Sequence, residues 1–153
     1  MSVQQIPRRW EEPWGQLAMD EMTANFGTTF AVTGTEVAIT DLQLSVDIPP
    51  GRRLRVTLVA GGQSTTGGIG QLILARLRDD LGLGGSSLKT GRFGCNVANS
   101  PFPVVIVWHG TSDSRGTYDF GLTMTRDVGG GTCTSTGAAT NPSQLVVEDL
   151  GPA

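Results

Sequence analysis

The sequence has very little of the side-chain chemistry on which most enzymes depend. In 153 residues it has one histidine, His109, one lysine, Lys89, and two cysteines, Cys95 and Cys133. It has no Cys/His cluster with metal-ligand spacing, no GxSxG, no GxxxxGK[ST] loop and no HExxH. We therefore expect a protein that is not an enzyme and that uses no cofactor or metal.

Charged residues and long apolar runs are also scarce. Charged residues make up 16% of the chain, where about 25% is typical of a domain, and the net charge is −3. An acidic chain with a pI of about 5.0 is a poor nucleic-acid binder. No apolar run approaches the ~20 residues of a membrane-spanning helix. We expect neither nucleic acid nor a membrane among its partners.

The residues that are abundant predict strands. Glycine, with 22 residues, is about twice as frequent as its usual ~7% share, and apolar residues alternate with polar ones through most of the chain. The clearest alternation runs over residues 41–48 and places four apolar side chains on one face: Leu42, Leu44, Val46 and Ile48. Residues 49–51, Pro-Pro-Gly, then predict a turn into a second alternating strand, 53–60.

Other segments carry less regular patterns. Residues 71–81 fit a strand better than a helix because their clearly patterned neighbours are strands, although their apolar spacing also suits a helical stripe. The glycine-rich residues 82–94 and 129–142 predict loops, the first with at most a short edge strand. The unbroken apolar run 104–108 predicts a strand covered on both faces.

Together these patterns predict an all-β fold. About eight to ten short strands separated by Gly/Pro turns, with no assured helix, are typical of a β-sandwich or a jelly roll. The length suits one domain with a short arm. We predict a sandwich domain at residues 15–153 and an extended N-terminal arm at residues 1–14.

The predicted arm carries side chains suited to binding a partner. Pro7 and Pro13 exclude both a helix and a central strand. Tryptophan and arginine are enriched at binding hot spots, and one tryptophan buries on the order of 150–250 Å². In the alternative interpretation the arm folds back and its tryptophans cover the chain's own core. We predict a partner interface made by the arm residues Arg8, Arg9, Trp10, Pro13 and Trp14.

The remaining polar residues have simpler interpretations. His109 is expected to make a hydrogen bond at a strand end rather than to bind a metal with Asp113. Cys95 and Cys133 either form a disulfide, which requires Cα atoms about 4.4–6.8 Å apart, or stay separate thiols in a reducing compartment. Five arginines are expected to pair with acidic residues such as Asp47, Asp79 and Asp80 rather than to form a basic stripe. They are Arg52, Arg53, Arg55, Arg76 and Arg78.

Three segments resemble small β-sandwich virion proteins of tailed bacteriophages that infect actinobacteria. They are PWG at 13–15, DLQLSVDIPPGRRLRVTLVA at 41–60 and QLVVEDLGP at 144–152, in the order expected of that family. The resemblance implies a jelly-roll-like or TNF/C1q-like sandwich on the surface of a phage particle, often trimeric, without catalytic residues. Residues 61–104 offer nothing to align.

This resemblance implies a capsid decoration or cement protein that binds the major capsid protein as a homotrimer at the capsid surface of the virion. The chain has no coiled-coil shaft, which favours a free-standing decoration protein over a long tail fibre. The alternative is a minor tail or fibre-tip module that adheres to host surface glycans, although the polar loops offer only Phe93 as an aromatic platform. A small cupin-like enzyme would need two or three converging histidines or carboxylates.

Overall fold

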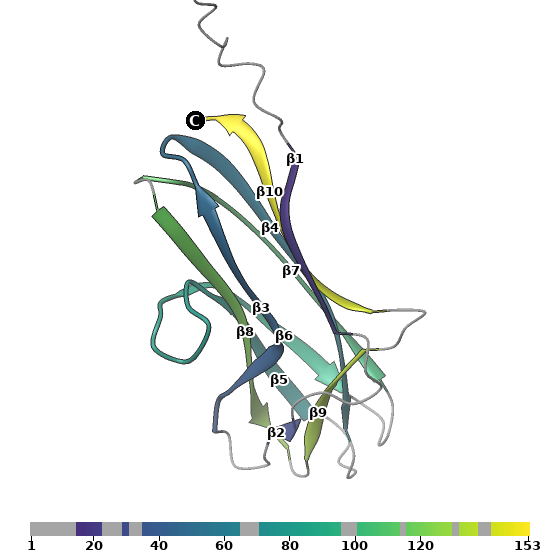
Figure 1. Ribbon diagram of the computed structural model, residues 1–153. Coiled ribbons are helices and arrows are strands. Elements are labelled where there is room, and N and C mark those ends of the chain that lie inside the picture. Colours follow the sequence, from purple (N-terminus) through teal and green to yellow (C-terminus); the bar gives the residue numbers. More distant parts are fainter. Residues whose placement is uncertain are drawn as a thin grey trace, which may run out of the picture.

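The fold is built entirely from strands. The computed structural model describes residues 15–22, 29–30, 35–64, 71–95, 101–113, 116–129, 132–137 and 142–153, and no helix occurs among them. Figure 1 shows the strands. They are β1 (Gly15–Met22), β2 (Thr29–Phe30), β3 (Val37–Ile48), β4 (Arg52–Ser64), β5 (Gln71–Arg78), β6 (Ser87–Cys95), β7 (Pro101–Thr111), β8 (Gly116–Val128), β9 (Cys133–Thr136) and β10 (Ser143–Pro152).

The strands form two antiparallel sheets with jelly-roll connections. The four long strands of sheet A follow the order β1-β10-β4-β7, and short β9 and β2 extend the sheet from the C-terminal part of β4. Sheet B follows the order β3-β8-β5-β6. Every link between consecutive long strands crosses from one sheet to the other, except the β5–β6 hairpin. This interleaving confirms the predicted jelly-roll sandwich.

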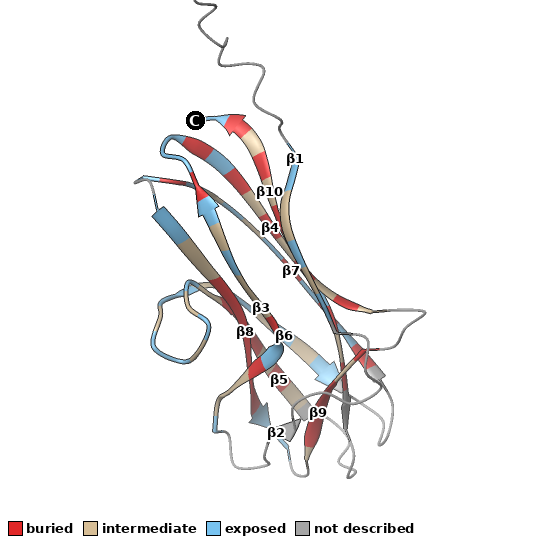
Figure 2. Cartoon of the chain, viewed as in Figure 1, coloured by how far each residue is buried: buried red, intermediate tan, exposed pale blue. Residues whose placement is uncertain are grey.

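The core lies between the sheets because each strand turns alternate side chains inward. Figure 2 shows buried positions alternating with exposed or intermediate ones along β4, and with intermediate ones along most of β10. Sheet A contributes side chains such as Leu58 and Ile106, and sheet B contributes Ile73 and Leu122, all at most 3% exposed. At the sheet edges β6 approaches β7 and β1 approaches β3, so the sandwich is almost closed.

The structure confirms the prediction for one of the less regular segments and corrects two others. Residues 71–78 form a strand, as predicted, with Ile73, Ala75 and Leu77 buried. The loop prediction for residues 82–94 is wrong from Ser87 onward, because β6 pairs along the whole of β5. The loop prediction for residues 129–142 missed β9, whose short polar sequence is stabilised by pairing with β4 and not by its own pattern.

Two polar contacts fix the outer parts of sheet B. The register of β3 shifts between Ile39 and Gln43, and the Gln43 amide N–H at this bulge donates to Asp20 Oδ2 of β1 at 3.0 Å. The loop after β5 folds over β8, where a Cβ on Gly121 would lie 2.5 Å from the carbonyl oxygen of Asp80. The Asp80 carboxylate accepts the amide N–H groups of Gly84 and Gly85 at 2.9 and 3.0 Å. This loop covers Gly121 on the outer face of β8, and Glu36 and Arg78 cover Thr123 on the same face.

Candidate interaction surfaces

The three segments that carry the family resemblance meet at one end of sheet A. Gly15 pairs with Asp149, and β10 pairs with β4, which follows directly from the β3–β4 turn. We call this region the tight end. It holds the C-terminus and the start of β1, both at the upper end of the view in Figure 1.

A buried ion pair lies at the centre of the tight end. Arg52 and Asp149 are 6% and 5% exposed, and Arg52 Nε and Nη2 lie 2.7 and 2.5 Å from Asp149 Oδ2. The other carboxylate oxygen, Oδ1, accepts the amide N–H of Gly151 at 2.7 Å. Gly151 has φ 98°, in the left-handed region that glycine adopts at low cost. The "GRR" and "VEDLGP" segments therefore share a structural role, which is to close this end of the sandwich.

Ser112, in the β7–β8 connection, forms hydrogen bonds with the β3–β4 connection at the same end. Its hydroxyl donates to the Pro49 carbonyl at 2.6 Å and accepts the Arg52 amide N–H at 2.9 Å. Its own amide donates to the Arg52 carbonyl, and its carbonyl accepts the Gly51 amide. One buried serine thus satisfies the backbone of both the β3–β4 and the β7–β8 connections.

The outer face of sheet A is apolar and uncovered. One row across four strands contains Met19, Val146, Thr57 and Val107, and the next row contains Val59 beside Val105. Met19, Val59, Val105 and Val107 are 43%, 44%, 54% and 42% exposed. We call these six residues the outer apolar face. The prediction that residues 104–108 are covered on both faces is wrong for this chain by itself, because nothing in the described residues packs on that side.

A charged row borders the outer apolar face. Arg55 donates Nε and Nη2 to the two carboxylate oxygens of Glu148, each at 2.7 Å. Hydrogen bonding from Arg55 holds the pKa of Glu148 below its ordinary value. His109 is the cross-strand neighbour of Arg55 and lies exposed at this row. An apolar centre beside a polar row is the usual anatomy of a protein–protein interface.

Four of the five arginines pair with acidic residues, as predicted, but not with Asp47, Asp79 or Asp80, because the strand register brings other carboxylates beside them. Arg52 and Arg55 pair with β10, whereas Arg76 and Arg78 of β5, in the other sheet, share Glu36. Arg78 Nε and Nη2 lie 3.0 and 2.8 Å from Glu36 Oε1, which also accepts the Thr123 hydroxyl. Burial raises the pKa of Glu36, but the hydrogen bonds from Thr123 and Arg78 and the charges of the two arginines outweigh it, so the net shift is downward.

The Glu36 cluster should therefore stabilise the fold in a pH-dependent way. Its folded-state pKa lies below the ordinary value of 4.5, so its contribution is complete above that pH and is lost as the pH falls further. We expect Glu36→Gln to lower the free energy of unfolding by about 1–2 kcal/mol at pH 7. Urea denaturation at pH 7 and pH 3 should show that difference shrinking in acid. Glu21→Gln, at an exposed position, controls for the loss of one negative charge; an equal deficit at both pH values would contradict the assignment.

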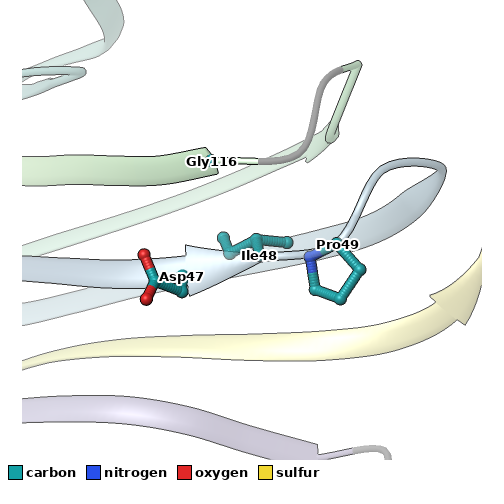
Figure 3. Close-up of a pocket in the computed structure, with 4 residues that line it drawn as sticks. All are labelled: Asp47, Ile48, Pro49 and Gly116. Atoms are coloured by element: carbon teal, nitrogen blue, oxygen red, sulfur yellow. The ribbon is translucent and has the colours of Figure 1, made fainter.

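A hollow opens between the sheets beside the β7–β8 connection. It has a volume of about 370 Å³ and is lined by Trp108, Tyr118 and Phe120 together with Asp79, Asp113, Asp119, Thr111, Thr117, Leu54 and Leu88. A second hollow of about 310 Å³ lies where β3 ends and β8 begins, lined by Asp47, Ile48, Pro49 and Gly116 (Figure 3). The Thr117 hydroxyl donates to Asp47 Oδ1 at 2.7 Å, so the two hollows share a wall.

The structure brings few of the predicted site residues together. Arg8, Arg9, Trp10, Pro13 and Trp14 lie outside the described residues, and so does the side chain of Cys95. Cys133 is fully buried in sheet A, and the two alternatives for it, a disulfide with Cys95 or a separate thiol, stay predictions. Sequence reasoning missed the hollow, because Trp108 and Tyr118 come from strands of different sheets. Their one signal was that a large aromatic side chain stands at one end of the inward-facing series of each strand.

Neither a metal site nor a membrane-spanning helix is found among the described residues. In the part of the chain that the structure describes, no three His, Cys, Asp or Glu side chains are close enough to share a metal ion. Across those same ranges, no helix has the length and apolarity needed to cross a membrane.

Comparison with known proteins gives similarity of fold alone. No protein-family model matches the sequence, and no characterised protein matches it in sequence. Among solved structures, the VP2 protein of infectious bursal disease virus in derived T=1 particles has a TM-score of 0.48 at 13% identity, over 86% of this chain and 35% of that one. The chain thus spans about a third of the length of that protein.

Two other solved structures match at lower TM-scores. The CBM22-1 xylan-binding domain from Paenibacillus barcinonensis has a TM-score of 0.38 at 9% identity, over 92% of this chain and 97% of that one. The enzymatically active domain of tailspike protein 4 from bacteriophage CBA120 has a TM-score of 0.36 at 12% identity, over 87% of this chain and 19% of that one. None of these similarities assigns an activity to the chain.

Proposed function

We propose that this chain is a non-enzymatic structural protein of a bacteriophage virion, a capsid decoration protein that binds the major capsid protein as a homotrimer. The observation that carries the proposal is the outer apolar face on a jelly-roll domain whose tight end is built from the segments that resemble virion proteins. An exposed apolar patch with a polar border marks a surface that becomes covered in an assembly.

The sheet geometry supports association through the outer apolar face. The face consists of Met19, Thr57 and four valines held in register by three adjacent strand pairs, so it is preorganised for contact. Arg55 and Glu148 at its border are paired with each other, so the apolar centre is the part that a second copy covers.

A charge placed in the outer apolar face should break the oligomer. We expect Val105→Asp to weaken self-association at least about tenfold, because a carboxylate would be desolvated in the interface. Light scattering coupled to size-exclusion chromatography measures the change. Leu83→Asp is the matched control, since Leu83 is 52% exposed, on the β5–β6 loop of sheet B, against 54% for Val105. Unchanged assembly of the Val105 variant, or equal loss in both variants, would contradict the proposed interface.

The arm is the proposed contact with the capsid. Combined replacement of Arg8, Arg9 and Trp10 by alanine should abolish binding to phage particles from which this protein has been removed, while the oligomer stays intact. The reason is that tryptophan and arginine supply most of the energy at typical hot spots. Occupancy is measured by co-sedimentation with the particles. Arg92→Ala, on the exposed edge strand β6, is the control, and full occupancy by the arm variant would refute this role.

The alternative function, a tail or fibre-tip module that binds host glycans, has one observation in its favour. The hollow combines aromatic walls with polar groups, as small-ligand sites do. Binding of the labelled protein to host cells, without binding to capsids, would favour this function over decoration.

A further inference from the structure

The hollow between the sheets is a site that capsid decoration leaves without a role. It opens on the opposite side of sheet A from the outer apolar face, since inward-facing Leu54 and Trp108 line it. Its volume of about 370 Å³ falls within the range of roughly 300–1,000 Å³ typical of small-ligand pockets. Its residues come from both sheets, so the fold itself fixes its shape.

The aromatic walls of the hollow are held in place by their neighbours. The Trp108 ring lies against the backbone of Gly110, where a Cβ would come within 2.0 Å of the ring. On its other flank the ring is tilted at 49° to Phe120, with centroids 6.3 Å apart. Trp108 and Tyr118 stay partly exposed while Phe120 is 2% exposed, so an indole and a phenol face the opening above an apolar floor.

The polar groups of the hollow are also preorganised. Asp119 Oδ1 accepts the Ser45 hydroxyl at 2.5 Å, and Asp113 Oδ1 accepts the Tyr118 hydroxyl at 3.1 Å. The strand neighbours of Asp119, Tyr118 and Phe120, face the core, so the Asp119 carboxylate lies on the outer face of sheet B with Ser45. The carboxylate held beside the aromatic walls is that of Asp113. Asp79 and Thr117 add further polar groups at the rim.

The charge and spacing of these groups select the class of ligand. Three aspartates and no lysine or arginine occur among the described lining residues, which disfavours an anion. The carboxylates do not converge closely enough to hold a metal ion, as judged over the described residues. A single ammonium group is bound best by carboxylates that converge on one point. Carboxylates at separate places around a rim instead suit a ligand with several separated hydroxyl donors.

We propose that the hollow binds a neutral saccharide through Trp108, Tyr118 and Asp113. The C–H face of a pyranose ring is slightly positive and packs on the negative π face of an aromatic side chain. Its hydroxyls donate to the Asp113 and Asp79 carboxylates, and such charge-assisted bonds are stronger than neutral ones. The site stands independently of the capsid proposal, because its residues lie between the sheets and not on the outer apolar face.

The test is titration of the full chain with soluble probes, followed by intrinsic tryptophan fluorescence and calorimetry. The probes are di- and trisaccharides of glucose, galactose, mannose and arabinose, with tetramethylammonium as the cation and sialic acid as the anion. We expect at least one neutral saccharide to bind with a Kd on the order of millimolar or tighter. Asp113→Asn and Trp108→Ala should each weaken that binding at least about tenfold, since each removes one recognition element.

Matched controls keep the outcome clear. Val128→Ala, 51% exposed at the opposite end of β8 from the hollow, should leave the Kd unchanged. Asp113→Asn removes a charge and keeps the shape, so it tests the site even if Trp108→Ala fails to fold. The proposal is overturned if no neutral saccharide binds below 20 mM (about −2.3 kcal/mol), if tetramethylammonium alone binds, or if both hollow variants bind like the Val128 variant. Loss of capsid binding with saccharide binding intact would refute decoration alone.

Discussion

Replacing Arg52 by alanine is expected to lower the free energy of unfolding by about 3–5 kcal/mol. The change leaves the Asp149 carboxylate, 5% exposed, without its cation, and an uncompensated buried charge is among the most destabilising single changes. For a domain whose total stability is about 5–15 kcal/mol, this is a large fraction. Urea denaturation followed by circular dichroism measures it, with Arg53→Ala as the control.

The control replaces the neighbouring arginine on the same strand. Arg53 is exposed, and among the described residues its side chain donates to the Leu150 carbonyl, at 3.2 Å. Its removal should cost less than about 1 kcal/mol. The double variant Arg52→Met with Asp149→Leu should recover much of the loss, because apolar residues of similar volume often replace a buried ion pair without penalty. A single Arg52 variant as stable as the unchanged protein would contradict a structural role for the motif.

The buried ion pair shows how far the sequence alone could lead. The alternation of residues 41–48 and 53–60 predicted two strands and the turn between them, and both are observed. The partner of Arg52 was not predictable from spacing, because Asp149 is 97 residues away and becomes a neighbour only through the pairing of β10 with β4. Local pattern identifies strands, whereas the cross-strand register decides which charges meet.

The run 104–108 shows a second limit of pattern. An apolar run predicts a strand covered on both faces, yet Val105 and Val107 face outward on an open sheet. The sequence shows that the outward-facing side chains of this strand are apolar. It does not show whether the surface that covers them belongs to the same chain. The open face in the folded chain is therefore the physical basis for the proposed oligomer.

The hollow could not be predicted from the sequence for a related reason. Its members lie on β4, β6, β7 and β8 and at the end of β5, and they converge only when the two sheets stack. From sequence, an aromatic platform for a glycan is expected on the glycine-rich loops, since loops usually carry binding residues. In this fold the aromatic side chains instead come from inward positions near strand ends, where the core gives way to solvent.

Phe120→Ala should be as destabilising as the loss of Arg52, at about 3–5 kcal/mol, and should also disturb the hollow. Phe120 is 2% exposed on the central strand β8, and its ring supports Trp108. Alanine would remove the transfer free energy of the ring and leave a cavity that the stacked sheets are too rigid to close. The change is measured as the shift in urea midpoint at constant m-value.

Tyr118→Phe is the matched control for Phe120→Ala. Tyr118 is the next inward position on the same strand, and this change removes only the hydroxyl that donates to Asp113. We expect it to cost about 1 kcal/mol or less. Trp108 fluorescence should change in the Phe120 variant, because the support of the indole is lost, and should stay nearly unchanged in the Tyr118 variant. If the Phe120 variant unfolds at the same urea concentration as the unchanged protein, the two sheets do not pack through this residue and the walls of the hollow are not fixed by the core.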